Sequence, residues 1–97
     1  MSILTCIAKL TAKEEYKQTV QSELKKLVLP TRQEAGCISY DMHIDNDNDT
    51  VFMFYERWEK EQDLDNHLES SNIKHCFEMI GDMLESVDIS RLTKVVG

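Results

Sequence analysis

The chain divides into segments with two different spacings of hydrophobic residues. Segments in which apolar and polar side chains alternate, as they do along a strand, cover residues 2–11, 37–44, 51–58 and 87–96. Segments with apolar residues three or four positions apart, as on one face of a helix, cover residues 12–34, 60–68 and 73–84. A polar run at residues 45–50 separates the second strand from the third and predicts an antiparallel hairpin.

The first helix carries its own start and stop signals. Thr11 is suited to cap its N-terminus, and Glu14, three residues later, completes a capping box. Gly36 is the expected stop, while Pro30 predicts a kink or an end followed by a new turn. The core-facing stripe of this helix consists of Tyr16, Val20, Leu24, Leu27 and Val28.

The order of elements is β-α-β-β-α-β, without a linker or a repeat. This order predicts one α+β domain over residues 1–97, with the ferredoxin-like fold of a four-stranded antiparallel sheet and helices on one face. Both faces of the first and third strands are apolar, so the face without helices must also be covered. A homodimer in which two sheets pack face to face, a dimeric α+β barrel, is the simplest solution.

The charge and the cysteines exclude several classes of function. The 97 residues include 11 basic and 18 acidic ones, and the net charge of −7 argues against binding nucleic acid or an anionic membrane. The N-terminal segment lacks the basic region of a signal peptide, and no run approaches the roughly 20 apolar residues of a membrane span. Three cysteines without a CxxC pair favour reduced, mostly buried thiols. We therefore expect a cytoplasmic protein.

A metal site is not expected. Asp45, Asp47, Asp49 and Glu56 have the spacing of a calcium-binding loop, but Thr50 stands where that loop needs a glycine, and the flanking segments are strands. The three histidines and three cysteines are dispersed, without the close spacing of metal ligands. The acidic run is therefore interpreted as a solvated turn.

The segment at residues 51–68 holds the best candidates for chemistry. His67 titrates near neutral pH and is the candidate acid or base, although a histidine packed in the core would fit the same pattern. Glu56 is a lone carboxylate in an aromatic strand, and burial would require a partner: either Arg91 in an ion pair or His67, which it would orient. Trp58, Tyr40 and Phe54 form either the aromatic walls of a ligand pocket or plain core packing.

Three motifs in this order resemble the antibiotic biosynthesis monooxygenase (ABM) family. They are Glu34-Ala-Gly36-Cys37-x-x-Tyr40, then Phe54-Tyr55-Glu56-Arg57-Trp58, then Leu64-x-x-His67-Leu68. The resemblance covers nearly the whole chain and implies a ferredoxin-like fold, a homodimer through the sheet faces, and a pocket between sheet and helices in each subunit. Some members of the family oxidise quinols or anthrone-like compounds with O₂ and without metal, flavin or haem.

For this chain the resemblance implies a cofactor-independent oxidation of a small aromatic substrate by O₂. A base removes a phenolic or benzylic proton, the resulting anion reduces O₂, and recombination with loss of water gives the quinone. In these terms His67 is the proton-transfer group, Glu56 supports it, and Trp58, Tyr40 and Phe54 bind the substrate.

The sequence also departs from the family in ways that narrow the chemistry. Ser70-Ser71-Asn72, which we expect to cap the helix at 73–84, stands where many relatives carry Thr-Pro-His, so the second histidine of that pattern is missing. The resemblance places Ile7, His67 and Phe77 where the haem-degrading branch carries Asn, Trp and a haem-ligating His, which argues against haem degradation. Two alternatives stay open: an isomerase of a small phosphorylated carbonyl compound, and a dimeric ligand-binding or stress-response module without catalysis.

Overall fold

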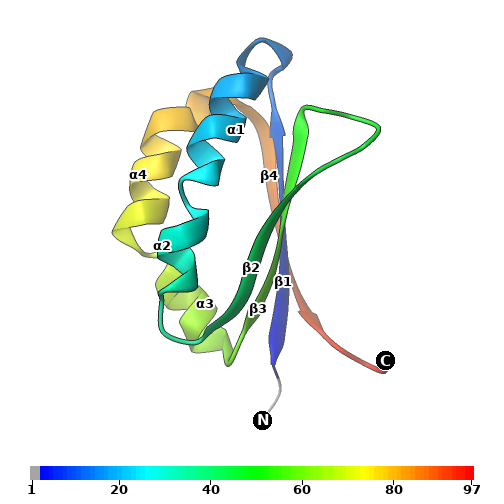
Figure 1. Ribbon diagram of the computed structural model, residues 1–97, viewed down its shortest axis with the longest axis vertical. Helices are drawn as coiled ribbons and strands as arrows, with labels where there is room; N and C mark the ends of the chain where they lie inside the picture. The colour runs from blue at the N-terminus through cyan, green and yellow to red at the C-terminus, as the bar shows by residue number, and fades with distance from the viewer. Residues whose placement is uncertain (1–2) are drawn as a thin grey trace.

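Four strands form one antiparallel sheet, and all the helices lie on one of its faces (Figure 1). The computed structural model describes residues 3–97, so Ser2, the predicted start of the first strand, lies outside the described residues. The strands are β1 (Leu4–Ala12), β2 (Cys37–Ile44), β3 (Val51–Trp58) and β4 (Leu84–Thr93), in the spatial order β2-β3-β1-β4. The helices are α1 (Lys17–Lys25), α2 (Val28–Arg32), α3 (Glu61–Leu68) and α4 (Ser71–Ile80), with 3₁₀ turns η1 (Glu14–Tyr16) and η2 (Gly81–Met83). The predicted ferredoxin-like α+β fold is therefore confirmed.

The core lies between the sheet and the helices. In the centre of the sheet, β1 pairs with β3 on one side and with β4 on the other. Alternation along β3 points four side chains at the helices, and all four are buried, including one carboxylate. They are Phe52, Phe54, Glu56 and Trp58.

The first helical region differs from the prediction at its start and in its middle. β1 continues to Ala12, so Thr11 pairs with Val51 in the sheet and does not cap a helix. Helix α1 ends at Lys25 and α2 begins at Val28. The break falls at Lys26 because Pro30, four residues later, has no N–H to donate to the Lys26 carbonyl. Pro30 itself lies in the first turn of α2, where a missing N–H costs little.

The C-terminal half follows the prediction with shifted boundaries. Ser70 caps α4 as expected, with its Oγ accepting a hydrogen bond of 3.3 Å from the Ile73 N–H. Helix α4 ends at Ile80, the chain turns through η2, and β4 begins at Leu84, three residues before the predicted start at Val87. Ile80 and Leu84 are four residues apart, as on one face of a helix, and for this reason the sequence-based prediction placed Leu84 in the helix.

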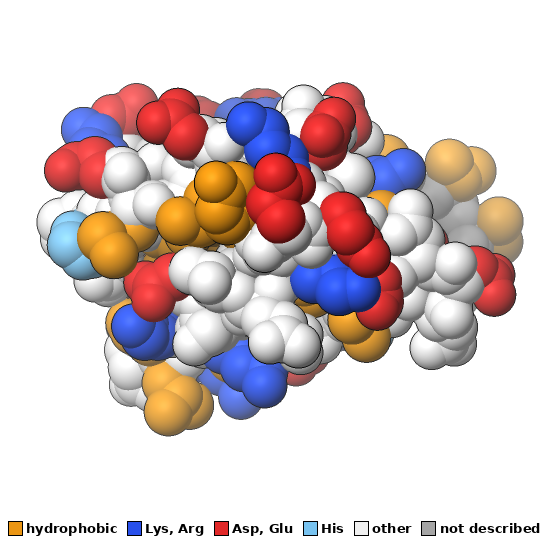
Figure 2. Space-filling model, turned by 90° about the horizontal axis from the view of Figure 1, so that it is seen from above, with side chains coloured by type: hydrophobic (Ala, Val, Ile, Leu, Met, Phe, Trp, Pro, Cys, Tyr) orange, Lys and Arg blue, Asp and Glu red, His pale blue; other side chains and the backbone are white. Residues whose placement is uncertain are grey.

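Two other sequence-based interpretations can be compared with the structure. Asp45 binds the backbone N–H of Asp47 within the hairpin turn, at 2.8 Å, while Glu56 is buried beneath the helices. The carboxylates with calcium-loop spacing therefore do not converge. Figure 2 shows acidic and basic side chains intermingled over one end of the molecule, without a continuous basic stripe. Among the described residues, no helix is long and apolar enough to cross a membrane.

Candidate active site

His67 is buried on an aromatic surface formed by two strands. Helix α3 carries it over the sheet, where it is 2% exposed. Its ring centroid lies 5.0 Å from that of Trp58 and 5.3 Å from that of Tyr40, which in turn stacks on Phe54 at 4.8 Å. Two of the predicted site residues, Trp58 and Tyr40, thus lie against the imidazole, and Phe54 stacks on Tyr40.

The hydrogen-bond partner of His67 is Glu34, which the sequence analysis did not propose. The His67 Nδ1 lies 2.8 Å from Glu34 Oε1. Burial lowers the pKa of His67, and the hydrogen bond and the charge of Glu34 partly oppose that effect. Because a carboxylate only accepts hydrogen bonds, we assign the proton of the neutral ring to Nδ1, which leaves Nε2 as the basic atom.

A tight turn after α2 holds Glu34 in place. The Cys37 N–H donates to the Glu34 carbonyl at 3.2 Å, and Gly36 adopts a φ of 82°, a conformation that favours glycine. A side chain at position 36 would also overlap the carboxylate of Asp63 on α3, the helix that carries His67. Gly36 therefore allows both the turn that orients Glu34 and the close approach of α3, the helix that carries His67.

Glu56 is the second acid of the site, and among the described residues no hydrogen bond joins it to His67. It is 3% exposed, and its Oε1 accepts a hydrogen bond of 3.0 Å from Trp58 Nε1. Burial raises the pKa of Glu56 to about 7, against the opposing effects of the hydrogen bonds from Trp58 and from the thiol of Cys6. Burial likewise raises the pKa of the Cys6 thiol to about 12, which keeps it protonated.

The partners predicted for Glu56 are therefore corrected. Arg91 donates instead to Glu61 at 3.1 Å and to Asp65 at 2.8 Å, and so joins β4 to α3. Within the described part of the chain, Glu56 forms no ion pair, and the carboxylate that supports His67 is Glu34. The spacing of the sequence could not show this, because Glu34 and His67 are 33 residues apart and meet only after α3 has packed.

A small apolar cavity, here called the inner cavity, lies beside His67 and Glu56 between the sheet and the helices. Its volume is about 30 Å³, room for about one water molecule. Tyr40 and Phe54 line it, whereas Trp58 does not line it and instead contacts His67 and Glu56, which do. Towards β4 its lining is partly open to solvent, because Val87 is 40% and Ile89 44% exposed. An aromatic molecule can enter the inner cavity only if its side towards β4 widens.

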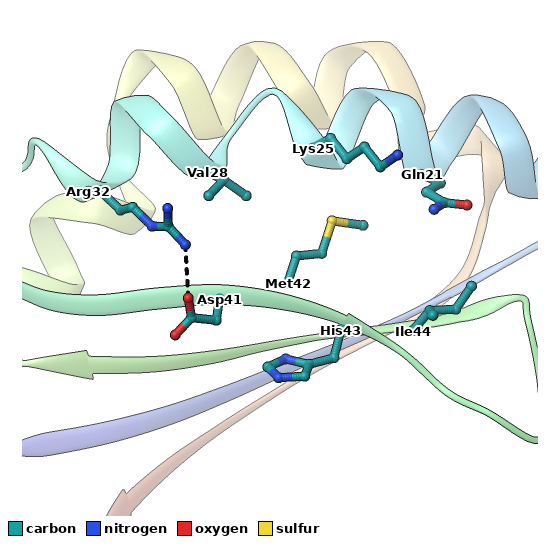
Figure 3. A pocket seen from close by; sticks show the side chains of 8 residues that line it. All are labelled: Gln21, Lys25, Val28, Arg32, Asp41, Met42, His43 and Ile44. Carbon is teal, nitrogen blue, oxygen red and sulfur yellow. Dashed lines mark hydrogen bonds and ion pairs between the residues drawn. The ribbon is translucent and has the colours of Figure 1, made fainter.

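A larger groove lies on the opposite side of α1 and α2, along the edge strand β2 (Figure 3). Its volume is about 340 Å³, and Met42 and Val28 point into its middle while Arg32 is paired with Asp41 at 2.8 Å. The groove contains none of the buried titratable groups described above. The inner cavity is therefore the candidate site, although the groove is larger.

The fold and the site together define a class of protein: a ferredoxin-like α+β domain in which a buried histidine, bonded to a carboxylate, borders an apolar cavity under the helices. Residues 3–79 match the family model described as antibiotic biosynthesis monooxygenase. The chain belongs to this family, as the three motifs predicted.

Similar proteins come from several bacteria. The uncharacterized protein sll1783 of Synechocystis is 33% identical over 72 residues, which are 74% of this chain and 46% of that protein, so the chain spans about half of it. A Mycobacterium tuberculosis protein named "Putative monooxygenase Rv0793" is 28% identical over 83 residues, 86% of this chain and 81% of that protein. The crystal structure of PA3566 from Pseudomonas aeruginosa is 30% identical, with a TM-score of 0.93 over 99% of this chain and 97% of that one.

Proposed function

We propose that this chain is a cofactor-independent monooxygenase that oxidises a small aromatic, quinol-type substrate with O₂ in the inner cavity. One observation carries the proposal: a buried histidine, bonded to a carboxylate, that lines an apolar cavity with aromatic walls. Family membership and the monooxygenase name of one relative support the same reaction class.

The reaction needs a base, an apolar site and O₂. His67 Nε2 takes a proton from a phenolic O–H or an activated C–H of the substrate, and the anion then transfers electrons to O₂. Recombination gives a peroxide, which takes a proton back. Loss of water then forms the carbonyl group, so that one oxygen atom enters the product and the other leaves as water. Glu56, whose pKa lies at about 7, holds a second exchangeable proton beside the same cavity.

The lining of the inner cavity favours this reaction over the isomerase alternative. Among the described residues, those that line it include no lysine and no arginine that could bind a phosphate group. The lining is instead formed by aliphatic and aromatic side chains around His67 and Glu56. A flat apolar substrate fits this lining better than a phosphorylated sugar.

The face of the sheet without helices supports the predicted homodimer. Ile3, Tyr55 and Leu92 are large hydrophobic residues on it, each more than 40% exposed. Contact with the same face of a second copy would bury them, which is the arrangement that the resemblance implies. We propose that two copies pack in this way and that each keeps its own inner cavity.

The function is tested by O₂ consumption with a panel of hydroquinones and anthrones. We expect uptake with at least one of them, ¹⁸O from ¹⁸O₂ in the product, and a loss of about 10²- to 10⁴-fold in His67→Ala. His75→Ala, which changes an exposed histidine on α4, is the matched control and should keep wild-type activity. Equal activity of His67→Ala and wild type on every substrate would refute the assignment. Turnover without O₂ would favour an isomerase, and thermal stabilisation without product would favour a binding module.

A further inference from the structure

His67 lies between two hollows with different linings. On one side it lines the apolar inner cavity. On the other side it lines a hollow of about 230 Å³, here called the outer hollow, whose other lining residues are mostly polar or charged. His67 is the one described residue that the two linings share. The rest of the outer hollow is lined by Glu34, Ala35, Asp63, Asn66 and Ser70.

We propose that Glu34 and His67 form a proton port: when His67 takes a proton from the substrate on Nε2, it releases its Nδ1 proton through Glu34 to solvent in the outer hollow, while the inner cavity stays closed. The inference rests on the proposed function, because it assigns a path to the proton of that reaction. Glu34 acts here as a positioning residue, since it contacts the imidazole and lines only the outer hollow.

Burial separates the roles of the two side chains. The side chain of His67 is 2% exposed and that of Glu34 is 22% exposed, so the hydrogen bond between them connects a buried atom to the surface. Donation from Nδ1 to Glu34 leaves Nε2 as the basic atom. After proton uptake, the carboxylate offsets the positive charge of the imidazolium in surroundings that disfavour a buried charge.

The step balances without a co-reactant. The substrate X–H and the neutral imidazole give X⁻ and an imidazolium, in which Nε2 carries the new proton and no electron is lost or gained. The Nδ1 proton passes along the hydrogen bond to Glu34 and from there to water in the outer hollow. The ring is then neutral and Nε2 carries the former substrate proton. A solvent proton that returns to Nδ1 through Glu34 restores the imidazolium, which can give its Nε2 proton to the anion or the peroxide.

Several other groups face His67, and the experiment must separate their effects from that of Glu34. Glu56 and Trp58 approach it from β3, Tyr40 from β2, and Asp63 lines the outer hollow on its own helix. In the described part of the chain, neither Glu56 nor Asp63 forms a hydrogen bond with the imidazole; Glu34 is the acid that does.

The first test uses no substrate and follows the ¹⁵N signals of His67 against pH by NMR. Wild type should show Nδ1 protonated and Nε2 free in the neutral ring. In Glu34→Gln the amide oxygen can still accept from Nδ1, but the charge is gone, so the pKa of His67 should fall by about 1–3 units. Glu69→Gln removes an exposed carboxylate two residues from His67, paired with Lys74, and should leave the titration unchanged. An unchanged titration in Glu34→Gln would overturn the inference.

The second test follows proton release to a pH indicator as an anthrone forms its anion on the enzyme under anaerobic conditions, which isolates the proton step from O₂ chemistry. Wild type should release a proton as the anion forms, and Glu34→Gln should slow this release by about tenfold or more. Asn66→Phe places a bulky side chain at the rim of the outer hollow. It should slow proton release while leaving the His67 titration as in wild type.

The two tests distinguish failure of the port from failure of the function. Proton release in wild type that neither variant slows would overturn the port but keep His67 as the base. If Glu34→Gln shifts the His67 titration but wild type neither releases a proton with an anthrone nor consumes O₂, the proposed function fails although the pairing stands. Slow proton release in both variants, with the titration shifted only in Glu34→Gln, supports the port.

Discussion

Glu56→Gln should make the stability of the protein less dependent on pH. The folded protein holds the Glu56 proton with a pKa of about 7, compared with about 4.5 for an unperturbed glutamate. The folded state therefore binds this proton more tightly than the unfolded state does. Its contribution to stability is fully present below about pH 4.5 and is lost as the pH rises towards 7. A glutamine has no such proton, so the variant lacks this loss.

The size of the effect follows from the two pKa values. A shift of this size corresponds to about 3 kcal/mol in full, of which about 2 kcal/mol is lost between pH 5.5 and pH 8.5. Over that range the free energy of unfolding of Glu56→Gln should therefore rise by about 2 kcal/mol relative to wild type. The amide oxygen can still accept the hydrogen bond from Trp58 Nε1, so the change in hydrogen bonding is small and independent of pH.

Urea denaturation at several pH values measures this difference. The chain has a single tryptophan, Trp58, whose indole contacts the carboxylate in question, so its fluorescence reports unfolding at the site itself. Protein concentration must be fixed, because association of two copies would raise the apparent stability. The control is Glu78→Gln, an exposed acid on α4. If the difference between Glu56→Gln and wild type does not change with pH, the buried acid titrates as a solvated one and the reasoning is wrong.

Two further predictions concern the turn that holds Glu34 and the exposed face of the sheet. Gly36→Ala should lower the free energy of unfolding, measured by urea denaturation, by about 2–4 kcal/mol, because alanine is strained at a φ of 82° and its Cβ overlaps Asp63. The double variant Gly36→Ala with Asp63→Ala should recover part of this loss, because it removes the overlapping carboxylate. Tyr55→Asp places a charge in the proposed contact between sheets, so the mass measured by light scattering at micromolar concentration should fall from that of two copies to that of one. Met79→Asp changes an exposed residue on the helical side and should leave the mass unchanged. A wild-type protein that is already a monomer would contradict the proposed homodimer.

The sheet could be predicted closely because its strands carry their signal locally. The bounds of β2 and β3 are those that alternation predicted, and the burial of Phe54, Glu56 and Trp58 on one face follows from the same period. The helical regions were less accurate at their ends. Apolar spacing alone does not show that Thr11 is paired in the sheet or that the Lys26 carbonyl lacks a donor.

The sequence placed the candidate residues close together but did not predict their contacts. His67, Tyr40, Phe54 and Trp58 meet as expected, since alternation and helical spacing fix the faces on which they lie. Which acid supports His67 depends on how far α3 leans over the sheet, a distance that no local pattern encodes. A glutamate placed just before a glycine turn was the available signal, and its use needed the tertiary packing.

The contact between Glu34 and His67 explains why the three motifs occur together. The first motif supplies the acid and the glycine turn that aims it, and the third supplies the histidine on the helix that packs against that turn. The middle motif supplies the aromatic floor and the second buried acid, Glu56, through a strand paired with β1 and β2. Since the turn, the strand and the helix each hold one side of the imidazole, we expect a change in any one of them to move it relative to the inner cavity. The arrangement therefore constrains the three segments jointly, although they are separated in sequence.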